Sequence, residues 1–463
     1  MLIKTFFSDT SGNFGFLTAL FVTLLCGAAG LAVDLSVVLA QRATLQVAAD
    51  AAALSVVAQN AVGQDTLQKA TEKVFFANLT KDMAKFSVLA PVSVPVENKL
   101  RVTASATVPL TLGAAFLPHG FTVRVVAEAE KAVPDVADIA LVLDTTASMQ
   151  GQKIADLKAA TQSLLGVFAA SRTGRARFSL VPFSDYVNVG VSNRGKSWLS
   201  VPADSIVTKK NICTTSAPIV SKSGCSMKPV VSYADGVATT KTREYCTTYT
   251  YGASTTRCSD QVTTYTWSGC VGSRNAPLDT GDTQPATRYP GIQNVKCGSP
   301  ITPLTSDFKA LSSAVAALTV QNNTYIPAGL LWGLNMLSPT EPFTEGASAP
   351  ATAPKFIVLL TDGDNSLRAL YPTHGGAISG TAANDTLTRT RSNATTLALC
   401  TEAKSRGITI FTVAVGTLLP SSTSLLQACA TDPNKAITTK DSAQLVKVFK
   451  DIANAMMVTR LTE

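Results

Sequence analysis

The chain has 463 residues, of which 46% are hydrophobic and 15% charged, and its formal net charge is +8. This length predicts two or three domains with enough apolar residues for their cores. No dense run of Lys or Arg occurs, which argues against a nucleic-acid partner. His119 and His374 lie far from any Ser/Asp or Cys pattern, which argues against a catalytic triad or a histidine-ligated zinc. We therefore do not expect an enzyme.

A charge-free stretch lies near the N-terminus. Residues 14–33 contain no charged side chain, and a helix of this length spans about 30 Å, the thickness of a bilayer core. We expect a cytoplasmic segment over 1–13 and a transmembrane helix over 14–40, with Asp34 as a charge at the membrane interface. The alternative is a signal peptide cleaved near Gly30-Leu31-Ala32.

Residues 41–134 predict a small α+β module. Strong helix formers continue without a break beyond the membrane segment, and Gln64–Lys85 has the pattern of an amphipathic helix. Strand-like segments follow at Phe86–Val96, Leu100–Leu110 and Phe121–Val133. This order of elements is similar to that of a pilin, and the module shows no pattern typical of a binding site.

Three short segments near the N-terminus support a family resemblance. They are Ser11–Phe14, Gly27–Asp34 and Leu45–Leu54. These segments resemble the N-terminus of the TadG-like proteins, which belong to the tight-adherence (Flp) pilus-assembly machinery of bacteria. The resemblance implies a single-pass protein of the bacterial inner membrane. Its C-terminal domain would lie in the periplasm or cell envelope.

The segment that follows the module joins a buried strand to a polar loop. Ile139–Leu143 is a continuous apolar run, typical of a strand covered on both faces of a parallel sheet. Gln152–Ala170 then has a helical pattern. Asp144, Thr146 and Ser148 therefore lie in a loop at the carboxyl end of a strand, where open α/β sheets bind ligands.

Two later segments provide similar oxygen atoms. Thr324 precedes a helix with Pro327 in its first turn, and Asp362 follows a second buried strand, Lys355–Leu360. Carboxylate and hydroxyl oxygens suit a hard cation such as Mg²⁺. The set resembles the metal-ion-dependent adhesion site of the von Willebrand factor A domain, whose pattern is Asp-x-Ser-x-Ser, then a Thr, then an Asp-Gly after a strand. The matching residues are Asp144, Thr146 (a Ser in the pattern), Ser148, Thr324 and Asp362.

Residues 135–463 are expected to form this A domain. The predicted strands and helices alternate, which indicates an α/β fold with a doubly wound (Rossmann-like), mostly parallel sheet. Further strands are expected at Arg177–Phe183 and Ile408–Val415, and further helices at Asp307–Leu318, Pro327–Leu337, Thr388–Arg406 and Ala443–Met457.

A cysteine-rich insertion interrupts the A domain over residues 192–303. It contains twelve Lys or Arg against six Asp or Glu, and Val237–Tyr251 and Gln261–Trp267 predict short strands. So polar a segment buries little hydrophobic surface, and disulfides would supply the stability that a hydrophobic core does not provide. Its exposed aromatic residues either form a contact face for a partner or cover the disulfides.

The nine cysteines indicate an oxidising compartment. Cys26 lies in the apolar segment, and the other eight form no C-x-x-C pair, which favours disulfides over zinc. Cys400 and Cys429 flank a predicted strand and are expected to pair. The sequence does not choose a pairing for the remaining six, which are Cys213, Cys225, Cys246, Cys258, Cys270 and Cys297.

These features predict a membrane-anchored envelope protein of a Flp pilus system that anchors or assembles the pilus. The resemblance to the adhesion site implies that Mg²⁺ or Mn²⁺ binds there and leaves a position for an Asp or Glu of a protein partner. The alternative is a metal-independent scaffold of the envelope, with contacts made by the insertion. The sequence leaves the partner and the oligomeric state open.

Overall fold

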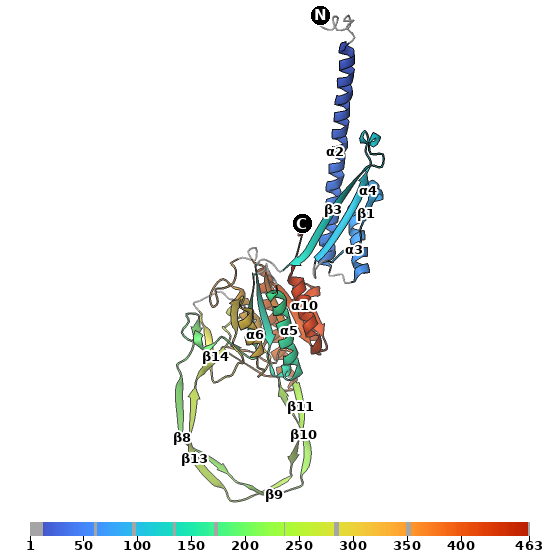
Figure 1. Ribbon diagram of the computed structural model, residues 1–463. Coiled ribbons are helices and arrows are strands. Elements are labelled where there is room, and N and C mark those ends of the chain that lie inside the picture. Colours follow the sequence, from blue (N-terminus) through green and yellow to red (C-terminus); the bar gives the residue numbers. More distant parts are fainter. Residues whose placement is uncertain are drawn as a thin grey trace. The chain divides into compact units, whose positions relative to one another are not determined.

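The computed structural model describes residues 13–59, 63–94, 99–132, 136–170, 175–235, 237–281, 287–348 and 353–461 (Figure 1). The chain forms two units, the first made of Met1–Ala132 with Met457–Glu463 and the second of Val133–Met456. Each unit has its own cluster of buried hydrophobic residues. The expected fold class is confirmed, because a long apolar helix, an α/β sheet and a disulfide-bonded β-rich region are all present.

The first unit is organised along one helix, α2, which runs from Asn13 to Ala58. Its N-terminal part exposes large apolar side chains, including Phe16 and Leu20, whereas further along Leu45 and Ala49 are fully buried. Among the described residues, α2 is the only helix long and apolar enough to cross a membrane. It continues without a break beyond the segment expected to span the bilayer.

An antiparallel sheet of four strands packs against the C-terminal part of α2. The strand order is β1-β2-β3-β22, with bounds Ser87–Leu89, Lys99–Val108, Phe121–Ala132 and Val458–Leu461. The last strand pairs with β3, placing Val458 opposite Ala132. The end of the chain therefore belongs to the first unit, whereas the sequence analysis assigned all of residues 135–463 to the A domain.

The amphipathic helix expected over Gln64–Lys85 is two helices. They are α3 (Gln64–Ala77) and α4 (Lys81–Phe86). The break arises because the Thr80 hydroxyl accepts a hydrogen bond from the Met83 N–H at 3.3 Å and so caps a new helix.

Asp34, on helix α2, forms hydrogen bonds with the loop that follows β2. Its carboxylate accepts hydrogen bonds from the backbone N–H groups of Thr111 (2.8 Å), Leu112 (3.0 Å) and Gly113 (2.6 Å), and from the Thr111 hydroxyl (2.5 Å). Asp34 is 4% exposed. The sequence predicted an interfacial charge at this position. The structure gives this carboxylate a set of donors within the protein.

Replacing Asp34 with Ala should loosen this loop, because three N–H groups and a hydroxyl lose their acceptor. We expect the free energy of local opening at residues 111–113 to fall by about 1–3 kcal/mol, measured by amide hydrogen exchange of the full chain in detergent. Asp50→Ala is the control, since Asp50 accepts its bond from Gln46 on the same helix at 2.8 Å. Unchanged exchange in Asp34→Ala would contradict the expectation.

The second unit contains a six-stranded sheet in the order β16-β5-β4-β17-β20-β21. All neighbours are parallel except β16 and β5. The sheet is therefore doubly wound and mostly parallel, as predicted. The strand bounds are Thr302–Thr305 for β16, Arg175–Phe183 for β5, Val136–Asp144 for β4, Lys355–Thr361 for β17, Thr409–Val415 for β20 and Ala436–Thr439 for β21.

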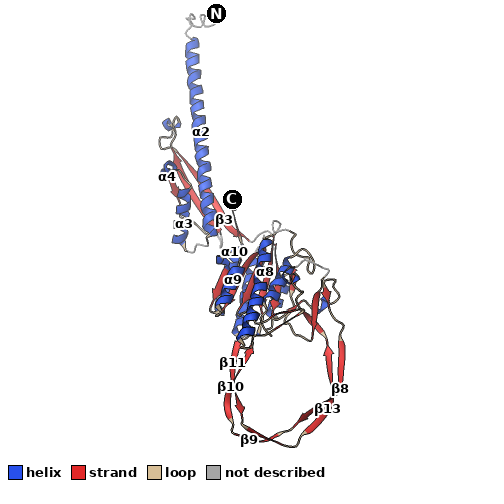
Figure 2. Cartoon of the chain, turned by 180° about the vertical axis from the view of Figure 1, so that it is seen from behind, coloured by secondary structure: helices blue, strands red, loops and turns tan. Residues whose placement is uncertain are grey.

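Helices cover both faces of this sheet (Figures 1 and 2). One face packs against α5 (Gln152–Ala169), α6 (Phe308–Ala316) and α10 (Leu445–Met456). The other packs against α7 (Ile326–Leu337), α8 (Ala382–Ser405) and α9 (Pro420–Cys429). The expected pairing of Cys400 with Cys429 is confirmed, and this disulfide joins α8 to α9. Helix α9 was not expected from the sequence.

Two glycines allow α7 to approach the sheet closely. A Cβ atom at Gly329 would lie 2.5 Å from Phe183 Cδ1, and one at Gly333 would lie 2.6 Å from Val142 Cγ2. Both distances are too short for a side chain. The close packing of α7 on β4 and β5 places its N-terminal end, preceded by Thr324, beside the end of β4.

Adding one methyl group at Gly329 should therefore destabilise the second unit. We expect Gly329→Ala to lower the free energy of unfolding by about 1–3 kcal/mol in urea denaturation. Gly166→Ala is the matched control in α5, where no atom lies within 4 Å of the added Cβ. That variant should gain about 0.5–1 kcal/mol, because alanine favours a helix interior. A gain in Gly329→Ala similar to that of the control would argue against close packing of α7.

The insertion is a loop of paired β-ribbons (Figure 1). Strands β8 (Ser205–Ser216) and β13 (Thr255–Tyr265) form one ribbon, and β10 (Ser226–Ala234) and β11 (Val237–Tyr245) form another. A short pair, β9 (Ile219–Ser223) and β12 (Thr248–Tyr251), connects the two. Strands β8, β9 and β10 were not expected from the sequence, because they lack the alternation of buried and exposed residues.

Three disulfides brace this region. Cys213 bonds Cys258 across the first ribbon, Cys225 bonds Cys246 at the base of the second, and Cys270 bonds Cys297 near the sheet. The described segments therefore use all eight cysteines outside α2 in disulfides, and Cys26 is a free thiol.

Candidate metal site

The polar loop after β4 holds three of the predicted ligands. The Asp144 carboxylate, at the end of β4, accepts hydrogen bonds from the Thr146 N–H at 2.9 Å and the Thr146 hydroxyl at 2.6 Å. The Thr146 and Ser148 hydroxyl oxygens lie 2.9 Å apart. The second oxygen of Asp144 accepts a bond from the Thr361 hydroxyl at 2.6 Å. Asp144 and Thr146 are fully buried.

The other two predicted ligands join this group from distant parts of the chain. The Thr324 hydroxyl donates to the Thr146 hydroxyl at 3.2 Å. The Ser148 hydroxyl donates to the Asp362 carboxylate at 2.6 Å. The structure thus brings all five sequence-predicted residues together at the carboxyl end of the sheet. They come from the loops that follow β4, precede α7 and follow β17.

These oxygens have the spacing and chemistry of a site for a small hard cation. Mg²⁺ is octahedral with Mg–O distances of about 2.0–2.1 Å, so neighbouring ligand oxygens lie roughly 3 Å apart. The distances of 2.9 Å between the Thr146 and Ser148 hydroxyls and 3.2 Å between the Thr146 and Thr324 hydroxyls match this spacing. The group contains only oxygen atoms, which favours Mg²⁺ or Mn²⁺ over softer metals.

The charges of the site are unbalanced. Asp144, Asp362 and Asp235 converge here, and among the described residues the ion pairs of the site contain one cation, Lys153, whose ammonium lies 2.5 Å from Asp362. Burial, followed by the charges of Asp362 and Asp235, raises the pKa of Asp144 from 3.8 to about 8. A divalent cation among these groups would remove the repulsion and favour the ionised carboxylates.

Sequence reasoning missed one carboxylate of the site. Asp235, from the turn between β10 and β11, accepts hydrogen bonds from the Thr324 and Ser366 hydroxyls at 2.7 and 2.8 Å. Asn365 accepts a bond from the Ile326 N–H at 2.9 Å and so fixes the start of α7. An Asp-Gly pair between two strand-like runs is a hairpin signal that marks Asp235 as a turn residue. Nothing in the local sequence marks it as part of this site.

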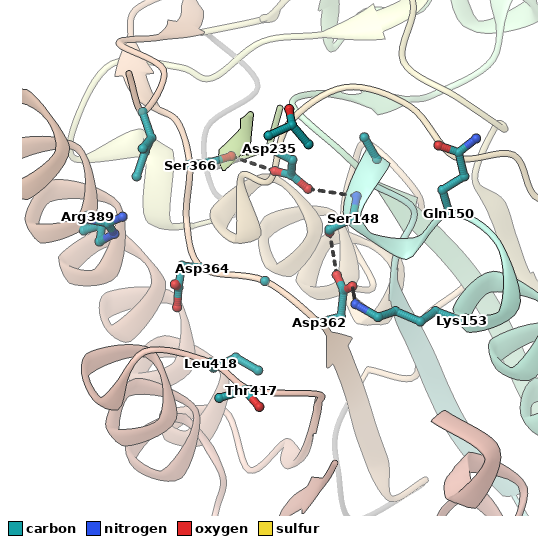
Figure 3. Close-up of a pocket in the computed structure, with 14 residues that line it drawn as sticks. Ser148, Gln150, Lys153, Asp235, Asp362, Asp364, Ser366, Arg389, Thr417 and Leu418 are labelled. Carbon is teal, nitrogen blue, oxygen red and sulfur yellow. Dashed lines mark hydrogen bonds and ion pairs between the residues drawn. The ribbon is translucent and has the colours of Figure 1, made fainter. Parts of the chain in front are cut away.

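A cleft of about 490 Å³ lies over the buried residues. Ser148, Asp235 and Asp362 line it together with Lys153 and Arg389 (Figure 3). The Nε atom of Arg389 is buried and has no hydrogen-bond partner among the described residues. The lining of the cleft thus combines hydroxyl and carboxylate oxygens with two cationic side chains.

The strand order, the helices on both faces and this polar end of the sheet make the second unit a doubly wound α/β domain, the architecture expected of a von Willebrand factor A domain. At the other end of the chain, residues 12–60 match the Tad family model, described as "Putative Flp pilus-assembly TadE/G-like". The N-terminal resemblance to the TadG-like proteins is thereby confirmed. No curated protein matches the chain.

Several solved structures are partly similar to the chain. Proximal thread matrix protein 1 from the mussel byssus, with a zinc-occupied MIDAS motif, has 15% identity and a TM-score of 0.33 over 72% of this chain and 49% of that chain. The von Willebrand factor type A protein from Catenulispora acidiphila has 12% identity and a TM-score of 0.30, over 80% of this chain and 50% of that chain. The vWF domain of the type V pili tip protein Mfa5 from Porphyromonas gingivalis has 13% identity and a TM-score of 0.33, over 70% of this chain and 95% of that chain.

The chain thus spans about half the length of the first two of these proteins. Because all three TM-scores are low, the strand order given above, and not these likenesses, defines the fold.

The raised pKa of Asp144 predicts the pH dependence of the metal-free protein. Between its unfolded pKa near 3.8 and its folded pKa near 8, the folded state holds a proton that the unfolded state has released. The stability contributed by this proton is complete below the unfolded pKa and is lost as pH rises through the folded pKa. We expect the unfolding midpoint in EDTA to fall between about pH 5 and pH 8. The fall should be smaller in Asp144→Asn, and an equal fall in both proteins would contradict the assignment.

Proposed function

We propose that this protein is a membrane-anchored envelope component of a Flp pilus system and binds a partner's carboxylate through a divalent cation. It would lie in the bacterial inner membrane through α2, with the A domain in the periplasm or cell envelope. There it would anchor or assemble the pilus. The match of residues 12–60 to the TadE/G-like family supports the pilus assignment.

One observation supports the metal site above all others. Three segments far apart in the sequence place five oxygen-bearing side chains at one end of the sheet, and the pattern also occurs in the A domain's adhesion site. The hydroxyls of Thr146, Ser148 and Thr324 would hold Mg²⁺ or Mn²⁺. Asp144 and Asp362 would supply negative charge from beside them. When bound, the cation supplies an electrophilic centre for a carboxylate oxygen.

Two cationic side chains lie beside the carboxylates of the cleft. They are Lys153 and Arg389, and the Nε atom of Arg389 has no acceptor among the described residues. An Asp or Glu from a pilus or envelope protein would place one carboxylate oxygen on the metal. Other hydrogen-bond acceptors of the partner would then bind Lys153 and Arg389. We propose no catalytic activity for this site, because binding of a carboxylate through a cation requires no general base or nucleophile.

The disulfides support the proposed location. Four disulfides hold the second unit, and such bonds form and persist outside the reducing cytoplasm. The free thiol, Cys26, lies in α2, and the eight disulfide-bonded cysteines all follow this helix in the sequence. This order fits a helix that enters the membrane from the cytoplasm and a body that is exported.

A metal-independent scaffold is the second candidate. The observation that favours it is the exposure of the ribbons, where every residue of β8 and of β9 is exposed. Large apolar side chains lie on this surface, among them Ile206, Ile212 and Val262. In this role the insertion would make the contacts, and the sheet would hold the ribbons in place.

Thermal unfolding of the full chain in detergent separates the two candidates. Mg²⁺ or Mn²⁺ should raise the unfolding midpoint relative to EDTA, because a ligand that binds only the native state stabilises it by mass action, by about 2.7 kcal/mol at a hundred times its Kd. Asp144→Ala should abolish this rise. Asp451→Ala, which removes an exposed carboxylate paired with Lys447 on α10, should retain it.

A midpoint that is equal in Mg²⁺ and in EDTA for the unmodified protein would argue for the scaffold. A rise that survives in Asp144→Ala would show that the cation binds elsewhere.

A further inference from the structure

The tip of the β10–β11 ribbon lies in the candidate metal site. The two strands pair along their whole length, from Ser226 opposite Tyr245 to Ala234 opposite Val237. Asp235 follows directly at the turn. Most of the ribbon is exposed, but Asp235 is only 7% exposed and lines the cleft (Figure 3). The ribbon therefore buries one carboxylate at its tip.

The contacts of Asp235 are with the residues proposed to hold the metal. One carboxylate oxygen accepts hydrogen bonds from the Thr324 N–H at 2.5 Å, the Thr324 hydroxyl at 2.7 Å and the Ser366 hydroxyl at 2.8 Å. The other accepts a bond from the Ser148 N–H at 3.4 Å. The Asp235 N–H donates to the Asn323 side-chain oxygen at 3.1 Å. Both the backbone and the side chain thus hold the tip in place.

The backbone of the tip is also unusual. Asp235 has a φ of 52°, in the left-handed region. Asp and Asn tolerate this conformation better than other residues with a side chain. The turn therefore places the Asp235 carboxylate at one end of the A-domain sheet, at the tip of a hairpin that is closed by a disulfide.

A third carboxylate beside Asp144 and Asp362 is unfavourable by itself. Like charges in a buried site repel one another, and among the described residues the one ion pair at this site joins Lys153 to Asp362. A divalent cation that bound all three groups would reverse the sign of this interaction. The position of Asp235 is therefore explained if the cation is its partner.

We infer that Asp235 is an internal ligand that occupies the place of the partner's carboxylate, so that the β10–β11 hairpin closes the site until a partner displaces it. This inference rests on the proposed metal site and adds its regulation. The chemistry is ligand exchange, in which one carboxylate replaces another on the same cation and no covalent bond changes.

The loop of ribbons provides the movement that this exchange needs. The hairpin joins the rest of the insertion only through β9 and β12, and Figures 1 and 2 show its tip meeting the A domain on the other side of the loop from β8 and β13. The Cys225–Cys246 disulfide closes the hairpin at its base. Release of Asp235 can therefore free the hairpin as one piece, without breaking the sheet of the A domain.

The first test measures Mn²⁺ binding by titration calorimetry on the full chain in detergent. We expect Asp235→Asn to weaken Mn²⁺ binding at least about tenfold. Asparagine keeps the shape of the side chain and the left-handed backbone. The matched control is Asp260→Asn, which makes the same charge change at an exposed aspartate of the insertion that accepts a bond from the Asn211 N–H. This control should bind Mn²⁺ as the unmodified protein does.

The second test uses acetate as the carboxylate probe. A tethered carboxylate competes at an effective concentration on the order of millimolar or higher. Acetate should therefore restore tight Mn²⁺ binding to Asp235→Asn at concentrations that leave the unmodified protein unchanged. Amide hydrogen exchange gives a separate readout. Mn²⁺ should slow exchange in the β10–β11 hairpin of the unmodified protein but not in Asp235→Asn, and excess acetate should reverse the protection.

The outcomes separate this inference from the proposed function. If Mn²⁺ binding is lost in Asp144→Ala but unchanged in Asp235→Asn, the internal ligand is overturned and the metal site stands. If Mn²⁺ leaves hairpin exchange unchanged in the unmodified protein, the internal ligand is overturned as well. If the unmodified protein binds no Mn²⁺, both proposals fail.

Discussion

The pairing of β4 with β17 is the constraint on which the rest of the second unit depends. The strands are parallel, with Leu143 opposite Leu360, so both end at the same edge of the sheet. Asp144 and Asp362 then follow at neighbouring positions. The Ser148 and Thr361 hydroxyls donate hydrogen bonds to these two carboxylates, and Lys153 forms an ion pair with Asp362. The start of α7 and the tip of the insertion meet the same edge of the sheet.

Much of this arrangement could be predicted from the sequence, because its signals are local. Ile139–Leu143 and Lys355–Leu360 are apolar runs that end in carboxylates, and each indicates both a buried strand and the position of its end. The loop hydroxyls at Thr146 and Ser148 lie within a few residues of the first run. Thr324 precedes a helix whose start Pro327 marks. Local patterns therefore predicted that these residues would lie together at one edge of the sheet, and the structure places them there.

Asp235 and the last strand could not be predicted in this way, because their positions depend on contacts between distant segments. Asp235 is 87 residues from Ser148 in the sequence, and the register of two exposed ribbons decides where it lies. Strand β22 is short and pairs with a strand more than three hundred residues earlier, by the numbering of Val458 and Ala132. Every residue of β8 and β9 is exposed, so hydrophobic alternation could not reveal these two strands.

The return of the chain to its first unit has a mechanical consequence. Two covalent links join the units, one after Ala132 and one before Val458, and these residues are opposite one another in a single sheet. A pulling force on the A domain is therefore shared by β3 and β22. Because Ala132 and Val458 lie opposite one another, the load enters both strands at the same end of the sheet, where the hydrogen bonds between β3 and β22 hold the two strands together.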